Sequence, residues 1–172
     1  MRKFDSLVVY PNMEDLDPFD VAILRVLQAD NMTPQRDIAE SIGLSAAAVQ
    51  RRIKRLRKNK IIAADTSVVD REKVGGLVTL LVEVSMSSER IDHIEEAKAL
   101  FAATPEVQQC YYVTGESDFL LIILTPSMEA YEGLTRKIFF SNEHIKSFKT
   151  RVALTLVKVG LSVPINYFPL SR

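Results

Sequence analysis

The 172-residue sequence has one cysteine, two histidines and no long apolar run. A single cysteine excludes an intramolecular disulfide framework and fits a reducing cytosol, and the apolar neighbours of Cys110 predict a small core residue. No stretch approaches the roughly 20 apolar residues that a membrane span needs. The hydrophobic start is too short for a signal peptide, because Asp5 interrupts it. We therefore expect a cytoplasmic protein with no membrane partner.

Signatures of catalysis and of metal binding are also missing. Residues 115–118 do not form a nucleophile elbow, because no second glycine follows Ser117. His93 and His144 are isolated in the sequence, so we expect surface residues and no metal site. The sequence contains no glycine-rich phosphate loop. It therefore predicts neither an enzyme nor a cofactor.

Net charge says nothing about partners, because 22 basic residues balance 22 acidic ones. The distribution of charge is more informative. Residues 45–60 hold seven basic and no acidic residues, whereas residues 83–96 hold five acidic residues and one basic residue. A nucleic-acid-binding surface is therefore expected to be local.

Two helix-start signals precede the basic segment. Asp17-Pro18 predicts a helix that ends near Asp30, and Thr33-Pro34 predicts another that ends at Gly43, which is free to adopt positive φ. Ser45 is a suitable N-cap for a third helix. Two short helices joined by a glycine-containing turn, the second strongly basic, are typical of a helix-turn-helix that enters the DNA major groove.

The third predicted helix is apolar on one face, which carries Val49, Ile53 and Leu56. Its other face presents short side chains first and Arg and Lys later, an order that suits base edges and then phosphates. A merely solvated helix usually mixes both charge signs, and this one does not. We therefore predict binding to double-stranded DNA, with these contacts: Thr33, Gln35, Ser45, Ala46, Ala47, Gln50, Arg51, Arg52, Lys54, Arg55 and Lys58.

The segment after this helix alternates apolar and polar residues over 61–69, which predicts a strand that packs on the helix or leads into a linker. Gly75-Gly76 marks a boundary. The predicted organisation is a leader (1–16), a helix-turn-helix domain (17–62), a linker strand and hinge (63–76), a second domain (77–160) and a tail (161–172). Within the leader, residues 7–10 fit either a short strand or a mobile arm.

In the second domain the sequence pattern predicts strands at 77–86, 107–114, 119–124 and 148–159. Helix signals lie at Ser87 or Ser88, with Ile91 facing inward, and at Pro126-Ser127. The order βαββαβ is the ferredoxin-like split motif, so the fold class is α+β.

The strand at 119–124 is apolar on both faces. Phe119, Leu121 and Ile123 lie on one side, and Leu120, Ile122 and Leu124 on the other. Both helices of the motif cover the same face, so the other apolar face needs a partner. A second copy of the chain supplies such a cover. We predict a homodimer whose two basic helices read a pseudo-palindromic site.

Motifs in both halves resemble the Lrp/AsnC (feast/famine) family of transcriptional regulators, of the leucine-responsive type, over about residues 16–160. The resemblance is carried by Asp17-x-x-Asp20, by Leu44-Ser45-x-x-x-Val49-x-Arg51-Arg52-Ile53-x-x-Leu56 with Ile61-Ile62, and by Tyr111-Tyr112-Val113-Thr114-Gly115-Glu116-Ser117-Asp118-Phe119. It implies a winged helix-turn-helix domain joined to an amino-acid-sensing domain. It also implies dimers that assemble into an octamer of four dimers, with the effector held between dimers.

The same resemblance implies an effector pocket made of Tyr112, Thr114, Gly115, Glu116, Ser117, Asp118, Thr150 and Val152. A glycine turn presents backbone N–H groups to a carboxylate, and Asp118 offers an acceptor to an ammonium group. A turn-capping role at the start of the hairpin is the alternative for Asp118. Leucine is the first expectation for the effector and methionine the second, because no basic residue adjoins the loop in the sequence.

Lys60 departs from the family pattern, since many relatives have glycine there; Asn59 is expected to take the positive φ instead. Two readings compete with a sequence-preferring regulator. One is a DNA-architectural protein of low sequence specificity. The other is a detached amino-acid-sensing module, which would not need the basic helix.

Overall fold

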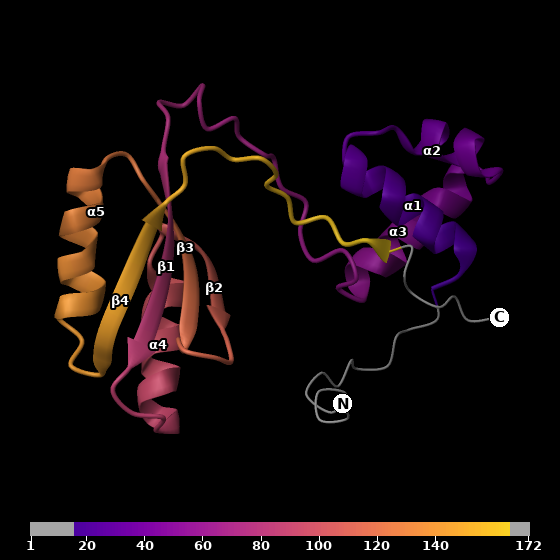
Figure 1. Cartoon of the computed structure of the whole chain (residues 1–172). Coiled ribbons are helices and arrows are strands. Elements are labelled where there is room, and N and C mark those ends of the chain that lie inside the picture. Colours follow the sequence, from indigo (N-terminus) through magenta and orange to yellow (C-terminus); the bar gives the residue numbers. More distant parts are fainter. Residues whose placement is uncertain (1–15, 166–172) are drawn as a thin grey trace. The chain divides into compact units, whose positions relative to one another are not determined.

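The structure, a computed structural model, describes residues 16–165 (Figure 1). The predicted arm or strand at residues 7–10 lies outside the described residues. The chain forms two compact units, one from the residues up to Ser67 together with those from Gly160 onward, and one from Val68–Val159. The elements are α1 (Pro18–Ala29), α2 (Gln35–Ile42), α3 (Ala46–Lys58), β1 (Val78–Met86), α4 (Ile91–Ala103), β2 (Val107–Tyr112), β3 (Phe119–Thr125), α5 (Met128–Thr135), the π-helical turn η1 (Arg136–Phe140) and β4 (Ile145–Val152).

The helices of the first unit begin and end largely where the sequence predicts. Asp17 caps α1 in a reciprocal capping box, in which the backbone N–H of each of Asp17 and Asp20 donates to the other's carboxylate. Thr33 does not cap α2; its hydroxyl donates to the Asp30 carbonyl, and α2 begins after Pro34 without a side-chain cap. Gly43 ends α2 at φ 72°.

The three helices enclose one apolar core. Its buried members are Ile23, Leu24, Ile38, Ala39, Val49, Ile53 and Leu56. The predicted apolar face of α3 is therefore confirmed. Ile61, Ile62 and, from the other end of the chain, Ile165 pack against this core while remaining partly exposed.

The strand predicted over 61–69 is wrong. Residues 63–70 adopt no regular structure, and Val68 is 96% exposed. A strand needs a neighbour to satisfy its backbone N–H and C=O groups, and none pairs with this segment among residues 16–165. The described part of the first unit thus has a helix-turn-helix without a β-wing.

The positive φ at the end of α3 falls on Lys60 (57°), not on Asn59 (−84°), so the expectation for Asn59 is wrong. The Ile61 N–H donates to the Leu56 carbonyl over 2.9 Å, and the Lys60 N–H donates to the Arg57 carbonyl over 3.0 Å. These two bonds form a Schellman motif, in which the left-handed position favours glycine. Lys60 occupies that position with a side chain.

Replacing Lys60 with glycine is expected to raise the free energy of unfolding by about 0.5–1 kcal/mol, because relief of left-handed strain outweighs the added entropy of the unfolded chain. Urea denaturation followed by helical circular dichroism measures the change. Asn59→Gly is the matched control, since φ at Asn59 is already negative. It is expected to be neutral or destabilising. An equal gain in both variants would contradict the assignment.

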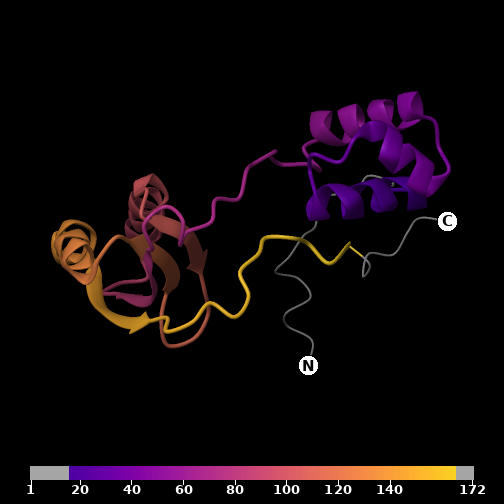
Figure 2. The same cartoon turned by 90° about the horizontal axis from the view of Figure 1, so that it is seen from above.

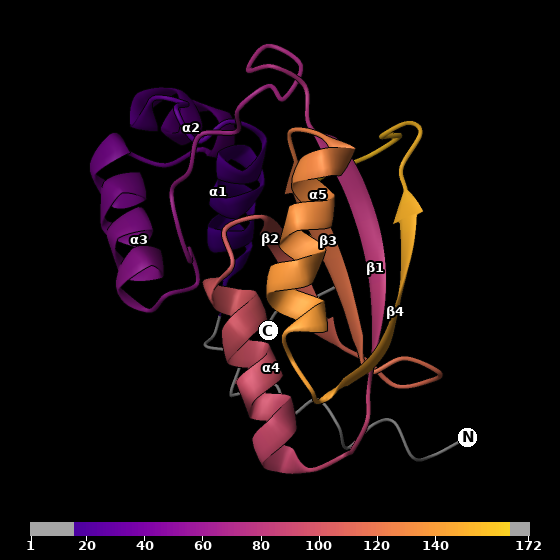
Figure 3. The same cartoon turned by 90° about the vertical axis from the view of Figure 1, so that its left-hand side faces the viewer.

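The second unit is the predicted βαββαβ motif. Its antiparallel sheet has the order β2-β3-β1-β4. Figures 2 and 3 show α4 and α5 on the same face of the sheet. On that face, Leu80, Val82 and Val84 of β1 pack with Phe119, Leu121 and Ile123 of β3 and with Phe101 of α4.

The final strand is shorter at its end than the predicted 148–159. It covers Ile145–Val152, and its last bond to the sheet runs from the Ala153 N–H to the Thr79 carbonyl. Because β1 begins at Val78, the residues beyond Ala153 have no strand to pair with. Leu154 and Val157 are accordingly 97% and 94% exposed.

Two burial predictions in this unit are also wrong. Cys110 is exposed rather than a core residue, because β2 is an edge strand that the helices do not fully cover. Ile91 is exposed because α4 begins at that residue, after Arg90 rather than after the predicted serine caps. Ser127, in contrast, caps α5 as predicted, with its hydroxyl accepting from the Ala130 N–H.

Between residues 16 and 165, no helix combines the length and the apolar character required to cross a membrane.

Candidate DNA-reading helix and effector loop

One face of α3 is exposed and carries short and basic side chains. Ser45 caps the helix by accepting from the Ala48 N–H over 3.2 Å, which fixes its first turn. Of the predicted DNA contacts on the helix, Arg52 and Arg55 apart, the structure leaves these exposed: Ala46, Ala47, Gln50, Arg51, Lys54 and Lys58. This set forms a continuous stripe along the helix, because the residues lie within about 140° of one another at 100° per residue.

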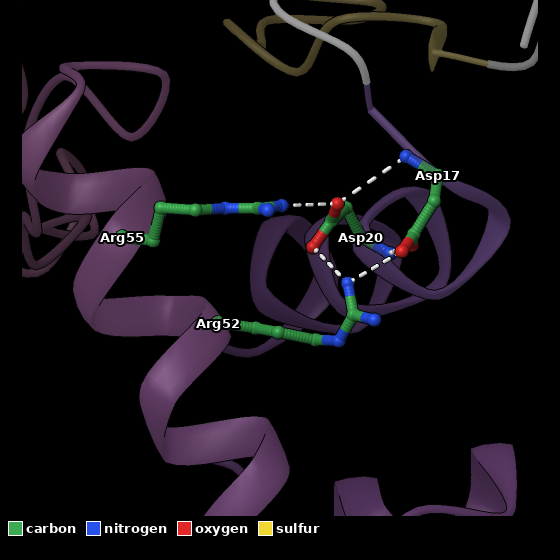
Figure 4. A network of polar contacts seen from close by, with 4 residues as sticks. All are labelled: Asp17, Asp20, Arg52 and Arg55. Carbon is green, nitrogen blue, oxygen red and sulfur yellow. Dashed lines mark hydrogen bonds and ion pairs between the residues drawn. The ribbon is translucent and has the colours of Figure 1, made fainter. Parts of the chain in front are cut away.

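Arg52 and Arg55 of α3 form ion pairs with α1. Asp20 of α1 is fully buried, and its two oxygens accept from Arg52 Nη1 (2.9 Å) and Arg55 Nη2. Arg52 Nη1 also donates to Asp17 Oδ2 over 2.7 Å, and its side chain is only 22% exposed. Figure 4 shows these four residues converging between the helices.

This Asp–Arg network gives Arg52 and Arg55 a role within the unit, and DNA contact by these two residues stays a prediction. Their guanidinium groups hold α3 against α1, and the side chain of Arg55 remains 48% exposed whereas that of Arg52 is 22% exposed. The sequence carried a signal for this pairing. Residues 17 and 20 share a face of one helix, residues 52 and 55 share a face of the other, and the charges are opposite.

The network also determines the charge state of Asp17. Burial by itself would raise its pKa, but the Asp20 N–H and the Arg52 guanidinium outweigh burial and lower the pKa below its ordinary value. A lowered carboxyl pKa stabilises the fold above the unfolded-state pKa. The contribution of Asp17 is therefore present at neutral pH and is lost as the pH falls through the lowered value.

The remaining DNA-contact candidates lie at the start of α2. Gln35 is its first residue and is half-buried, and Thr33 lies two residues before it. The hydroxyl of Thr33 is engaged with the Asp30 carbonyl. Arg57, a basic residue of α3 outside the predicted set, forms an ion pair with Asp65 through Nε at 2.9 Å.

The loop between β2 and β3 has a defined backbone. The Val113 N–H donates to the Asp118 carbonyl and the Asp118 N–H donates to the Val84 carbonyl, both over 2.9 Å. Gly115 has φ 129°, a conformation that suits glycine. Thr114, Gly115 and Glu116 are exposed and Ser117 is half-buried.

Asp118 has a structural role in this loop. Its Oδ2 accepts from the Met86 N–H over 2.7 Å, which joins the loop to the end of β1. This contact is the turn-capping alternative that the sequence left open. One carboxylate oxygen is therefore already used by the fold.

Tyr112 lies next to the loop and is half exposed. Its ring packs against Phe119 with centroids 5.3 Å apart, and the ammonium of Lys98 lies 4.9 Å from its centroid. Lys98 is a basic residue beside the loop that sequence spacing did not reveal, because it comes from α4. Its Nζ also forms an ion pair with Glu95.

Thr150 and Val152 do not lie beside this loop within one chain. They belong to β4, and Thr150 is opposite Val82 of β1, which in turn pairs with Leu121 of β3. Two strand spacings, about 10 Å, therefore separate β4 from β3. The hydroxyl of Thr150 is hydrogen-bonded to that of Tyr131. The predicted effector residues thus form two separate clusters on one copy.

His93 and His144 are not isolated surface residues, contrary to prediction. Their rings stack with centroids 3.6 Å apart, and their side chains are 19% and 22% exposed. Stacked parallel rings do not point their nitrogens at a common ion. In the described part of the chain no cluster of His, Cys, Asp and Glu is arranged to hold a metal.

Comparisons with known proteins agree with both halves of this description. Residues 16–57 match the family model described as the AsnC-type helix-turn-helix domain, and residues 79–163 match the Lrp/AsnC ligand binding domain. An uncharacterised HTH-type transcriptional regulator of Sinorhizobium fredii, y4tD, is 44% identical over 152 residues, which are 88% of this chain and 90% of that protein. The matched families and relatives are transcriptional regulators, not enzymes.

Two solved structures have the same arrangement of elements. The AsnC family transcriptional regulator from Agrobacterium tumefaciens superposes with a TM-score of 0.84 and is 27% identical, over 90% of this chain and 100% of that one. The transcriptional regulator NMB0573 of Neisseria meningitidis, solved as an L-Met complex, gives a TM-score of 0.81 and 27% identity over 88% and 97%.

Proposed function

The chain belongs to the Lrp/AsnC family of transcriptional regulators, and on this premise we propose that it reads DNA with the exposed stripe of α3 under control of leucine or methionine. The observation that carries the proposal is that some basic residues of α3 are ion-paired to α1 whereas others are exposed to solvent. Arg52 and Arg55 hold the helix in place, while Arg51, Lys54 and Lys58 are exposed.

The exposed stripe of α3 has the order of side chains that groove insertion requires. Ala46 and Ala47 in the first turn allow the backbone to come close to the base pairs. Gln50 and Arg51 then reach base edges, where a bidentate arginine discriminates between bases. Lys54 and Lys58 lie further along the helix and reach phosphates, which set the strength of binding rather than its specificity.

Replacing Arg51 with alanine is expected to reduce discrimination between a preferred site and random duplex by about 5- to 150-fold, the equivalent of 1–3 kcal/mol. Lys58→Ala is the matched control on the same stripe. It is expected to weaken binding to all DNA alike and to lower the salt slope by about 1. Anisotropy titrations at several salt concentrations measure both quantities.

Equal losses for the two variants would argue against base reading by Arg51. A wild-type protein that bound preferred and random duplexes with the same affinity would favour the alternative function, a DNA-architectural protein of low specificity.

Several features support an amino-acid effector at the β2–β3 loop. The turn at Gly115 is exposed and has a conformation that can present backbone N–H groups to an anion, and the ammonium of Lys98 beside Tyr112 is a candidate partner for a carboxylate. The Neisseria relative was solved with L-Met, so methionine now ranks beside leucine. Because Asp118 already accepts from Met86, it has one oxygen left for an ammonium group.

We propose that this effector site is completed by a second copy. The loop cluster and the Thr150–Val152 cluster lie on different strands of one chain, so a pocket that uses both needs residues from neighbouring copies. The homodimer and the octamer of four dimers, expected from the sequence, provide such neighbours. The open face of the sheet, with half-buried Leu81 and Ile122 at its centre, is the proposed dimer contact.

A further inference from the structure

The last described residues return to the DNA-binding unit. The chain leaves this unit after Ser67, forms the second unit, and rejoins the first at Gly160. The segment that follows β4 is the yellow trace in Figure 1. The two units are therefore joined by two connections, one before β1 and one after β4.

The returning segment is held by a two-point hydrogen bond. The Gln28 side chain in α1 donates from Nε2 to the Val163 carbonyl over 3.1 Å, and its Oε1 accepts from the Val163 N–H over 2.6 Å. The amide of Gln28 thus pairs with the backbone as a neighbouring strand would. Recognition of this kind depends on backbone position and not on the side chain at 163.

An apolar contact accompanies the pair. Ile165 packs against the apolar core of the first unit, and its N–H donates to the Val163 carbonyl over 2.8 Å. The residues before it, from Leu154 to Val163, are exposed. The segment is therefore an exposed tether with its contacts concentrated at residues 163–165.

We propose that residues 160–165 form a docked anchor on α1, which ties the effector unit's last strand to the DNA-binding unit and carries the effector signal between them. The inference rests on the proposed function for its signal, since Thr150 and Val152 lie directly before the tether. Binding of the effector at Thr150 and Val152 would then strengthen or weaken the contact of residues 160–165 with α1.

The length of the tether explains why a small contact suffices. From Val152 to Val163 the chain spans at most about 40 Å when fully extended. A segment held that close has an effective concentration on the order of millimolar at its docking site. Two hydrogen bonds and one aliphatic side chain would not hold a free peptide, but they hold a tethered one.

Amide hydrogen exchange on the full chain, without DNA or effector, tests the docking. In the wild type the Val163 amide is expected to exchange at least tenfold more slowly than the amide of exposed Leu161. Gln28→Ala is expected to remove that difference, whereas Arg25→Ala, an exposed position on the same helix, preserves it. A Val163 amide that exchanges as fast as that of Leu161 in the wild type, or is equally protected in Gln28→Ala, overturns the anchor.

The coupling has its own readout. We measure DNA affinity with and without saturating methionine or leucine for wild type, Gln28→Ala and Ile165→Ala. In both variants the effector-induced change is expected to fall at least threefold, while the effector's own Kd stays within twofold of wild type. An unchanged effector response in variants whose anchor is released contradicts the coupling. If the wild type has no effector response, the proposed effector function fails and the coupling with it, while hydrogen exchange still decides the docking.

Discussion

Replacing Asp20 with alanine is expected to lower the free energy of unfolding of the DNA-binding unit by about 3–5 kcal/mol. Asp20 is fully buried and accepts from both Arg52 and Arg55. Removing its carboxylate leaves Arg52, which is only 22% exposed, without its most deeply buried partner. It also removes one half of the capping box of α1. Since domains of this size are stable by roughly 5–15 kcal/mol, the loss is a large share of the total.

Urea denaturation, with hydrogen exchange of the α1 amides as a local probe, measures the loss. Asp37→Ala is the matched control, because Asp37 is also an aspartate in the first turn of a helix but has a side chain that is 50% exposed. Its exposed ion pair with Arg36 is worth about 0–1 kcal/mol. Similar losses for Asp20→Ala and Asp37→Ala would show that the network is not what holds α1 to α3.

If the open sheet face is the proposed dimer contact, replacing Ile122 with lysine is expected to raise the dimer dissociation constant at least about a thousandfold, because an unpaired buried charge costs several kcal/mol and symmetry places it in the interface twice. Ile122 pairs with Leu81 at the centre of the open sheet face. The fold of each copy is expected to persist, since the helix-covered core uses Phe119, Leu121 and Ile123 instead.

Sedimentation velocity over a range of concentrations measures the dissociation constant. Ser147→Lys is the control, because Ser147 lies on the same face but is exposed on the edge strand β4. It is expected to change the constant by less than tenfold. A dimer that tolerates lysine at 122 would place the interface elsewhere on the molecule.

The features that the sequence predicted correctly depend on local signals. Asp17, Ser45 and Ser127 each have a short polar side chain and directly precede a segment whose apolar residues recur at helical spacing. Each of them caps a helix in the structure. The alternation in 119–124 gave the two faces of β3 because side chains on a strand alternate whatever its neighbours are. The order βαββαβ then followed from the order in which strand-like and helix-like spacings of apolar residues occur along the chain.

The errors concern features that depend on partners distant in the sequence. Residues 61–69 alternate like a strand, but no strand lies beside them in the described chain. The end of β4 is set by where β1 begins, not by the apolar residues that continue to Val159. The ion pair of Arg52 was missed for the same reason, because its partner Asp20 lies 32 residues away along the chain.

The proposed effector site was predictable only in part for the same reason. The loop at 113–118 could be placed because a tight connection joins two adjacent strands. Lys98 comes from α4, and the Thr150–Val152 cluster comes from the far edge of the sheet. The positions of these residues relative to the loop do not follow from their spacing along the chain.

The most direct test of the account is the affinity of the full chain for DNA, measured with and without amino acid at one fixed salt concentration. The duplexes are the best site from in vitro selection and a random sequence. We expect the selected site to bind about a thousandfold or more tightly, and leucine or methionine to change that affinity by about 5- to 150-fold. Equal affinity for both duplexes, unchanged by any of the common amino acids, would contradict the claim that this chain is an amino-acid-controlled reader of DNA.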